Sequence, residues 1–340
     1  MPPPVPEGVH EPNGADGAAL SVRPDLDGLP LLEFLSCQLI GESKTRLRRL
    51  IGSGAIRLNG TAATPRRTVH TADVVTLPPG LEHTTPPRQA LAIRVIYEDD
   101  ALLCIDKPAG HPVLPARGGR DAELFQSLLA LLNRDAPPGG PYRRPHVVHR
   151  LDRETSGTLL VAKTVQAGRA LSRQFEQREV EKVYLALIEG VLPRAELTVD
   201  APLSRMTGSA LKMAPARRGG KPAVTHMRLL ERFGHFSVVE ARPKTGRQHQ
   251  IRVHLAATGY PLAVDVLYGR RTRLTASDLS AIVGRRATSA RGVLLARCPL
   301  HAATIAYRHP LSGGPMRHQA PCPADLASLL DLLREADPPA

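Results

Sequence analysis

The chain has 340 residues, with 45 lysine and arginine residues against 32 acidic ones and a formal net charge of +13. This surplus favours a polyanionic partner, either nucleic acid or an anionic membrane surface. No apolar run approaches the ~20 residues of a membrane-spanning helix, and the N-terminus lacks the pattern of a secretory signal. We therefore expect a soluble, cytoplasmic protein in which the four dispersed cysteines are free thiols.

The chain is expected to divide into four segments. Residues 1–28 are rich in proline, glycine and acidic residues, which predicts a disordered tail. Residues 29–80 form a small basic domain, and residues 81–92 form a proline-rich linker. Residues 93–336 form the large domain, where predicted strands and helices mix without regular alternation. This mixture favours an α+β fold over a doubly wound parallel sheet.

A short basic helix is the main feature of the small domain. It begins at Lys44, after a serine that can cap it, and has an apolar stripe at i, i+3 and i+4. An Asn59-Gly60 hairpin turn follows it. Four cations in six residues, with no acidic residue between them, would repel one another on an ordinary solvated face, so we interpret the helix as an anion-binding surface. These cations are Lys44, Arg46, Arg48 and Arg49.

The run from His149 to Gly157 places one carboxylate, Asp152, between Arg150 and Arg153. Adjacent arginines favour the ionised carboxylate, which in a constrained turn can act as a nucleophile or a base. Taken alone, such a run is more often a structural ion-paired turn between two strands. Other parts of the sequence have to decide between the two interpretations.

Two further segments could serve the same chemistry. Tyr184 lies in a predicted strand over residues 183–188, where a core tyrosine with a satisfied hydroxyl is the simpler interpretation. Residues 248–254 alternate polar and apolar side chains, which predicts a strand that begins just after Arg247. An arginine at that position can pair bidentately with a carboxylate or a phosphate.

Several reaction classes lack their sequence signatures. The chain contains no G-x-x-x-x-G-K-[ST] phosphate loop and no G-x-S-x-G nucleophile elbow. His149 and Asp152 could share a metal ion, as in a metal-dependent phosphoesterase. However, no second acidic cluster accompanies them, and the adjacent arginines oppose cation binding. We therefore expect neither a cofactor nor a metal ion.

Residues 43–51, 54–60 and 73–75 together resemble the RNA-binding domain named after small-subunit ribosomal protein four. This resemblance implies a small N-terminal α/β RNA-binding domain. Its basic helix would contact structured RNA, mainly at phosphates, so that binding depends on salt.

Six motifs follow one another in the large domain, and any one of them alone would be weak. They are Asp106–Gly110, His149–Gly157, Lys182–Ala186, Gly220–Thr225, Thr245–His254, and Leu300–Ala302 followed by His309-Pro310. In this order they closely resemble the pseudouridine synthases of the RluA family. The resemblance implies the pseudouridine synthase fold, a mixed, largely antiparallel central sheet flanked by helices.

The resemblance also implies a role for each matching residue. Asp152 matches the catalytic aspartate, and Tyr184 matches the tyrosine that stacks on the target base and helps remove the proton from uracil C5. Arg247 matches the arginine that pairs with the catalytic carboxylate. Arg150 matches an arginine that enters the RNA and helps hold the base out, and Leu300 an apolar residue that packs near the flipped base.

The implied activity is the conversion of uridine to pseudouridine in structured RNA, an isomerisation that needs no cofactor. The additional N-terminal domain makes the chain similar to family members that modify large-subunit ribosomal RNA, and we expect a monomer. Transfer RNA as the substrate and a non-catalytic role in RNA binding or ribosome assembly remain open alternatives. One loop departs from the family pattern Gly-Asp-Pro-x-Tyr-Gly, because Val264 and Val266 replace its first glycine and its proline. This departure bears on fine substrate choice more than on catalysis.

Overall fold

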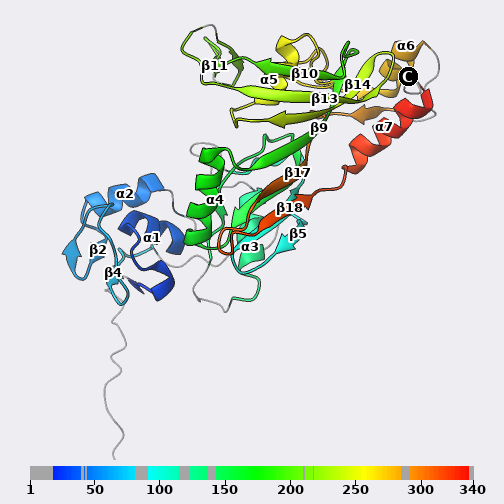
Figure 1. Cartoon of the computed structure of the whole chain (residues 1–340). Coiled ribbons are helices and arrows are strands. Elements are labelled where there is room, and N and C mark those ends of the chain that lie inside the picture. The colour runs from blue at the N-terminus through cyan, green and yellow to red at the C-terminus, as the bar shows by residue number, and fades with distance from the viewer. Residues whose placement is uncertain are drawn as a thin grey trace, which may run out of the picture. The chain divides into compact units, whose positions relative to one another are not determined.

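The computed structural model forms two compact units (Figure 1). The first comprises Met1–Arg88 with Leu129–Arg144, and the second comprises Gln89–Leu128 with Pro145–Ala340. No helix among the described residues is long and apolar enough to cross a lipid bilayer. The described residues are 18–39, 42, 44–81, 91–114, 123–136, 143–209, 211–216, 218–284 and 291–336.

Within the described residues, the first unit contains a four-stranded antiparallel sheet with the strand order β1-β4-β2-β3. The expected hairpin turn is present, because β2 pairs with β3 and the intervening Asn59 and Gly60 have φ angles of 48° and 73°. The elements are β1 (Ala19–Ser21), a 3-10 helix (Pro24–Leu26), α1 (Leu31–Gln38), α2 (Lys44–Gly52), β2 (Arg57–Leu58), β3 (Thr61–Ala62) and β4 (Val74–Thr76).

The first unit begins ahead of the boundary expected at residue 29. Leu20 of β1 pairs with Val75 of β4, and both side chains are buried. The prediction of a disordered tail is therefore wrong for residues 19–28, because a three-residue strand is too short to show in composition but still completes the sheet. Residues 1–17 of the expected tail and 82–90 of the expected linker lie outside the described residues.

The second unit is built on a ten-stranded sheet, counted over the described residues. The strand order is β10-β13-β14-β9-β17-β8-β6-β5, with β18 added to β17 and β7 added to β8. Only β17 and β8 pair in parallel among these strands, so the expected mixed, largely antiparallel α+β sheet is confirmed. The strands are β5 (Arg94–Glu98), β6 (Leu102–Lys107), β7 (His146–Val147), β8 (Ser156–Ala162), β9 (Glu181–Glu189), β10 (Glu196–Asp200), β13 (Val224–Arg232), β14 (Phe236–Pro243), β17 (Leu300–Arg308) and β18 (Pro315–Gln319).

Helices cover both faces of this sheet (Figure 1). Two neighbouring residues of β14 contact helices on opposite faces. Val239 shares a core cluster with Ile251 of α5, whereas the neighbouring Val238 shares one with Leu329 of α7. Successive side chains of a strand point to opposite faces, so α5 and α7 pack on opposite sides. The helices are α3 (Glu123–Leu132), α4 (Val165–Gln177), α5 (Gln250–Ala257), α6 (Ala276–Val283) and α7 (Ala324–Ala336). Two further two-stranded antiparallel sheets pair β11 (Leu203–Arg205) with β12 (Met213–Pro215), and β15 (Leu274–Thr275) with β16 (Val293–Leu295).

Candidate active site

Asp152 lies on the loop that leads into β8, close to the parallel pairing of β8 with β17. At this pairing Ser156 Oγ and His301 Nδ1 are 3.0 Å apart in the core. Gly157 has a φ of 112°, and a Cβ built there would lie 2.3 Å from the carbonyl oxygen of Ala302. A glycine at position 157 is thus required by the close approach of the two backbones at the start of β8, where the Asp152 loop joins the sheet. The Asp152 side chain stays 24% exposed.

A buried lysine supports the other side of this loop. Lys107, at the end of β6, is fully buried, and its Nζ donates to the carbonyl oxygens of Pro108, His111 and Arg153 at 2.8, 2.8 and 3.1 Å. Burial lowers the pKa of Lys107 to about 8. Gly110 N also donates to Arg153 O at 2.9 Å. The Asp106–Gly110 motif therefore holds the backbone directly after Asp152.

Arg252 of α5 is the ion-pair partner of Asp152. Its Nη1 lies 3.2 Å from Asp152 Oδ2, while its Nε and Nη2 donate to the two carboxylate oxygens of Asp265 at 2.7 and 2.8 Å. Both Arg252 and Asp265 are buried. Burial is the largest single influence and acts to lower the pKa of Arg252, but the hydrogen bonds to Asp265 and the surrounding negative charges together raise the pKa overall. The sequence interpretation gave no role to either residue, although both lie in segments that it compared with the family pattern.

The expected ion pair between Arg247 and Asp152 is not present in this structure. Arg247 Nε donates instead to the carbonyl oxygen of Pro222 at 3.1 Å. The predicted strand over residues 248–254 is also wrong, because α5 begins at Gln250. The Gln250 side chain is buried and bonds to Thr245 Oγ1, to Arg247 N and to Val224 O, which fixes the start of the helix. Short polar and apolar alternation cannot separate a strand from a helix whose sides are both buried.

The loop that departs from the family pattern still holds its polar side chains. Asp265 Oδ1 accepts hydrogen bonds from the backbone of Leu267 and Tyr268, at 2.9 and 3.1 Å. Val264 is fully buried, whereas Val266 is 62% exposed. The two substitutions thus leave Asp265 in place against Arg252.

Tyr184 and Leu300 lie on adjacent strands, β9 and β17, and in one apolar cluster. Leu300 is buried at the start of β17. Burial and, to a smaller extent, the negative charge of Asp152 raise the pKa of Tyr184, so its phenol is protonated at neutral pH. The structure therefore brings Tyr184 into electrostatic reach of Asp152, beside an apolar wall that includes Leu300.

Three more side chains lie around the carboxylate. His249 Nε2 is 4.0 Å from Asp152 Oδ1, and His249 Nδ1 is 2.8 Å from the hydroxyl of Tyr268. Arg150 is exposed and forms no ion pair within the part of the chain that the structure describes. Its charge acts on His249, which places Arg150 near the same site.

The cations of α2 belong to the first unit and fall into two pairs. Lys44 Nζ binds Glu33 of α1 at 2.7 Å, and Arg46 Nη1 binds Glu42 at 2.5 Å. These acids lie outside the helix sequence, so its run of cations does not reveal them. The other pair is Arg48 and Arg49, which are both exposed and form no ion pair with any described residue.

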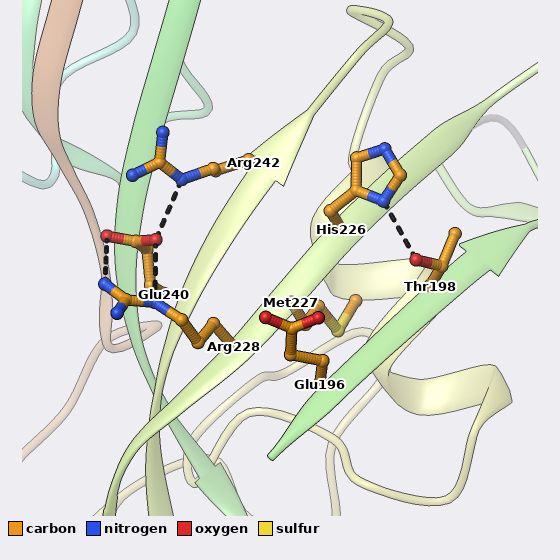
Figure 2. A pocket seen from close by; sticks show the side chains of 7 residues that line it. All are labelled: Glu196, Thr198, His226, Met227, Arg228, Glu240 and Arg242. Carbon is orange, nitrogen blue, oxygen red and sulfur yellow. Dashed lines mark hydrogen bonds and ion pairs between the residues drawn. The ribbon is translucent and has the colours of Figure 1, made fainter. Parts of the chain in front are cut away.

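Figure 2 shows a groove across β10, β13 and β14, away from Asp152. Glu240 is one of the residues that line it and is paired with Arg228 at 3.3 Å and with Arg242 at 2.8 Å. Tyr184 pairs in register with Ala241, so the neighbouring Glu240 points to the other face of the sheet. This groove is consequently separate from the site around Asp152. Across the described residues, no group of three or more His, Cys, Asp or Glu side chains is arranged to hold a metal ion.

Comparisons with known proteins agree with this geometry. Residues 101–257 match the family model described as RNA pseudouridylate synthase. The chain is 43% identical to the ribosomal large subunit pseudouridine synthase D of Xanthomonas campestris pv. campestris, covering 86% of this chain and 85% of that protein. It is 36% identical to the protein of the same name from Pseudomonas aeruginosa, covering 89% and 92%.

The solved structure of human RNA pseudouridylate synthase domain containing 4 has the same fold. Its TM-score is 0.55 at 24% identity, over 71% of this chain and 93% of that one. The fold, the motif order and the sequence identity over most of the chain agree. This chain therefore belongs to the RNA pseudouridine synthase family and is an isomerase of that class.

Proposed function

We propose that this protein converts uridine to pseudouridine in large-subunit ribosomal RNA, with Asp152 as the catalytic carboxylate. The observation that supports the catalytic assignment is the ion pair of a partly exposed Asp152 with a buried Arg252, beside Tyr184. The names of the relatives from Xanthomonas and Pseudomonas support the class of RNA.

In the proposed reaction the bond between C1′ and uracil N1 breaks, and a bond between C1′ and C5 forms. The hydrogen on C5 leaves as a proton and N1 gains one, so nothing is added or lost overall. Asp152 acts at the sugar, either by attacking C1′ or by removing a sugar proton, and both routes use the ionised carboxylate. Arg252 fixes that carboxylate, while Tyr184 and Leu300 receive the base once it has left its stack.

The first unit is proposed to bind RNA in the manner of the ribosomal-protein-four domain that its sequence resembles. Exposed Arg48 and Arg49 on α2 support this role, since unpaired cations can contact phosphates without displacing an existing ion pair. Arg150 is proposed to enter the RNA next to the flipped nucleotide. The proposed setting is the cytoplasm and the proposed state a monomer, which light scattering of the purified protein tests.

Pseudouridine mapping in total RNA tests the proposed substrate. Cells that lack the gene are expected to lose one or more pseudouridines from large-subunit ribosomal RNA. Wild-type protein should restore them, whereas Asp152→Asn should not, although it binds RNA. If pseudouridines were lost only from transfer RNA, transfer RNA would be the substrate instead. An unchanged pseudouridine map would favour the non-catalytic RNA-binding alternative.

A further inference from the structure

His249 sits in a strained position directly before α5. Its backbone has φ 55° and ψ 19°, the left-handed region that residues other than glycine rarely adopt. Its side chain is 12% exposed and faces Asp152 on one side and Tyr268 on the other. The bond to Tyr268 thus orients the ring, since His249 makes no capping bond to the helix.

The hydrogen bonds of Tyr268 favour one tautomer of His249. The backbone N–H of Met213 donates to the Tyr268 hydroxyl at 2.8 Å, so this oxygen already accepts one bond. Among the described residues, its other hydrogen-bond partner is His249 Nδ1, at 2.8 Å. The hydroxyl hydrogen is satisfied if it points to Nδ1, which then accepts. In that arrangement the ring proton lies on Nε2, the nitrogen that faces Asp152 Oδ1 at 4.0 Å.

The charges around the ring agree with a neutral imidazole. Burial lowers the pKa of His249, and Arg252 and Arg150 act in the same direction, against the carboxylates of Asp152 and Asp265. The Tyr268 ring also lies beside the Arg252 guanidinium, whose carbon is 5.2 Å from the ring centre. One tyrosine therefore supports both side chains that face Asp152.

We propose that His249 is a positioning residue that holds the second oxygen of the catalytic carboxylate. Arg252 Nη1 faces Oδ2 and His249 Nε2–H faces Oδ1, so the two donors together fix the plane of the carboxylate. The N–O gap of 4.0 Å closes when bound RNA moves the loop slightly, because catalytic hydrogen bonds often shorten only in the substrate complex. Tyr268 acts through His249 by fixing its tautomer. This inference rests on Asp152 as the catalytic carboxylate.

Two substitutions of His249 separate the donor function from simple packing. In His249→Gln the amide nitrogen takes the place of Nε2 and can still donate to Asp152, whereas in His249→Asn the amide reaches only as far as Nδ1. We expect His249→Asn to lower the single-turnover rate on a ribosomal RNA fragment by roughly 10- to 100-fold, with RNA affinity unchanged. His249→Gln should stay within about threefold of wild type. Equal rates for the two variants, or a faster Asn variant, would overturn the proposal.

Two further measurements do not depend on that ranking. The ¹⁵N chemical shifts of the His249 ring in wild-type protein should place the proton on Nε2, and a proton on Nδ1 would contradict the proposal. Tyr268→Phe should slow the wild-type enzyme but add no further loss to His249→Asn, because both act on one path. If the losses of the two substitutions multiply, Tyr268 does not act through His249.

The variant Asp152→Asn in the same assay separates a failure of this proposal from a failure of the proposed function. Turnover by that variant would disprove the catalytic role of Asp152, whereas its inactivity leaves only the role of His249 in question.

Discussion

Arg252 Nη1 lies 3.2 Å from Asp152 Oδ2, although 100 residues separate them in the chain. The same guanidinium binds Asp265 with its other nitrogens, so one buried side chain connects the loop before β8, α5 and the loop after it. The position of the proposed catalytic carboxylate therefore depends on α5.

Arg252→Gln should impair both catalysis and stability. We expect the single-turnover rate to fall by about 100-fold or more, because Asp152 loses a charged donor. The free energy of unfolding should fall by about 3–5 kcal/mol, because the buried Asp265 carboxylate loses its positively charged partner. Arg247→Gln is the matched control, with a chemical rate within about threefold of wild type. If Arg247→Gln lowered the rate more than Arg252→Gln, Arg247 would be the arginine that pairs with Asp152 during catalysis.

Lys107→Met should destabilise the catalytic domain by about 2–4 kcal/mol at pH 7, since three carbonyl oxygens lose a charged donor. Urea unfolding measures this difference. Met is the matched replacement because its unbranched chain fills most of the same space.

The same variant carries a pH prediction. The pKa of Lys107 is lowered from its ordinary value of 10.5 to about 8 by burial, so the unfolded chain binds more protons between these values. Stability from this group therefore rises with pH from about 8 to 10.5. The stability difference between wild type and Lys107→Met should widen over that range. A constant difference would show that Lys107 keeps an ordinary pKa.

Gly157→Ala should be strongly destabilising, by about 3 kcal/mol or more, since it adds a steric clash to a positive φ. The new Cβ would lie 2.3 Å from Ala302 O, in the backbone of a core strand that cannot move away. Gly246→Ala is the control, because no atom lies within 4 Å of the Cβ position there. Thermal unfolding of the two variants compares them, and similar melting temperatures would argue against tight packing of β8 on β17.

The cations of α2 should differ in their contribution to RNA binding. Arg48→Ala with Arg49→Ala is expected to weaken RNA binding and to reduce the salt slope of log Kd by up to about 2, roughly one for each phosphate that is no longer neutralised. Lys44→Ala with Arg46→Ala, which removes cations already paired with Glu33 and Glu42, should have a smaller effect. Single-turnover rates on saturating RNA should not change in either double variant. If both double variants reduced the salt slope equally, the ion pairs of Lys44 and Arg46 would have to open when RNA binds.

The sequence motifs predict the fold class and identify the segments that form the site, but they do not identify the arginine that pairs with Asp152. Arg247 and Arg252 both belong to the Thr245–His254 motif. Which of them reaches the carboxylate depends on whether the segment is a strand or a helix, and seven alternating residues do not settle this.

Lys107 is missed for a different reason. A lysine is expected at the surface, and the burial of Lys107 is compensated by backbone carbonyl oxygens, two from the segment that follows it and one from Arg153. No side-chain pattern in the sequence can show such partners.

The parallel pairing of β8 with β17 joins residues 145 positions apart, as the hydrogen bond between Ser156 and His301 shows. Closing so long a stretch of chain is slow and has to precede the interactions that reward it. During refolding, we expect helices and local hairpins to form first and the loop that carries Asp152 to be fixed only when β17 pairs with β8. We therefore expect regained turnover to be a late marker of refolding. A chain truncated before β17 should lose the strand that joins β8 to β9, and with it the geometry around Asp152.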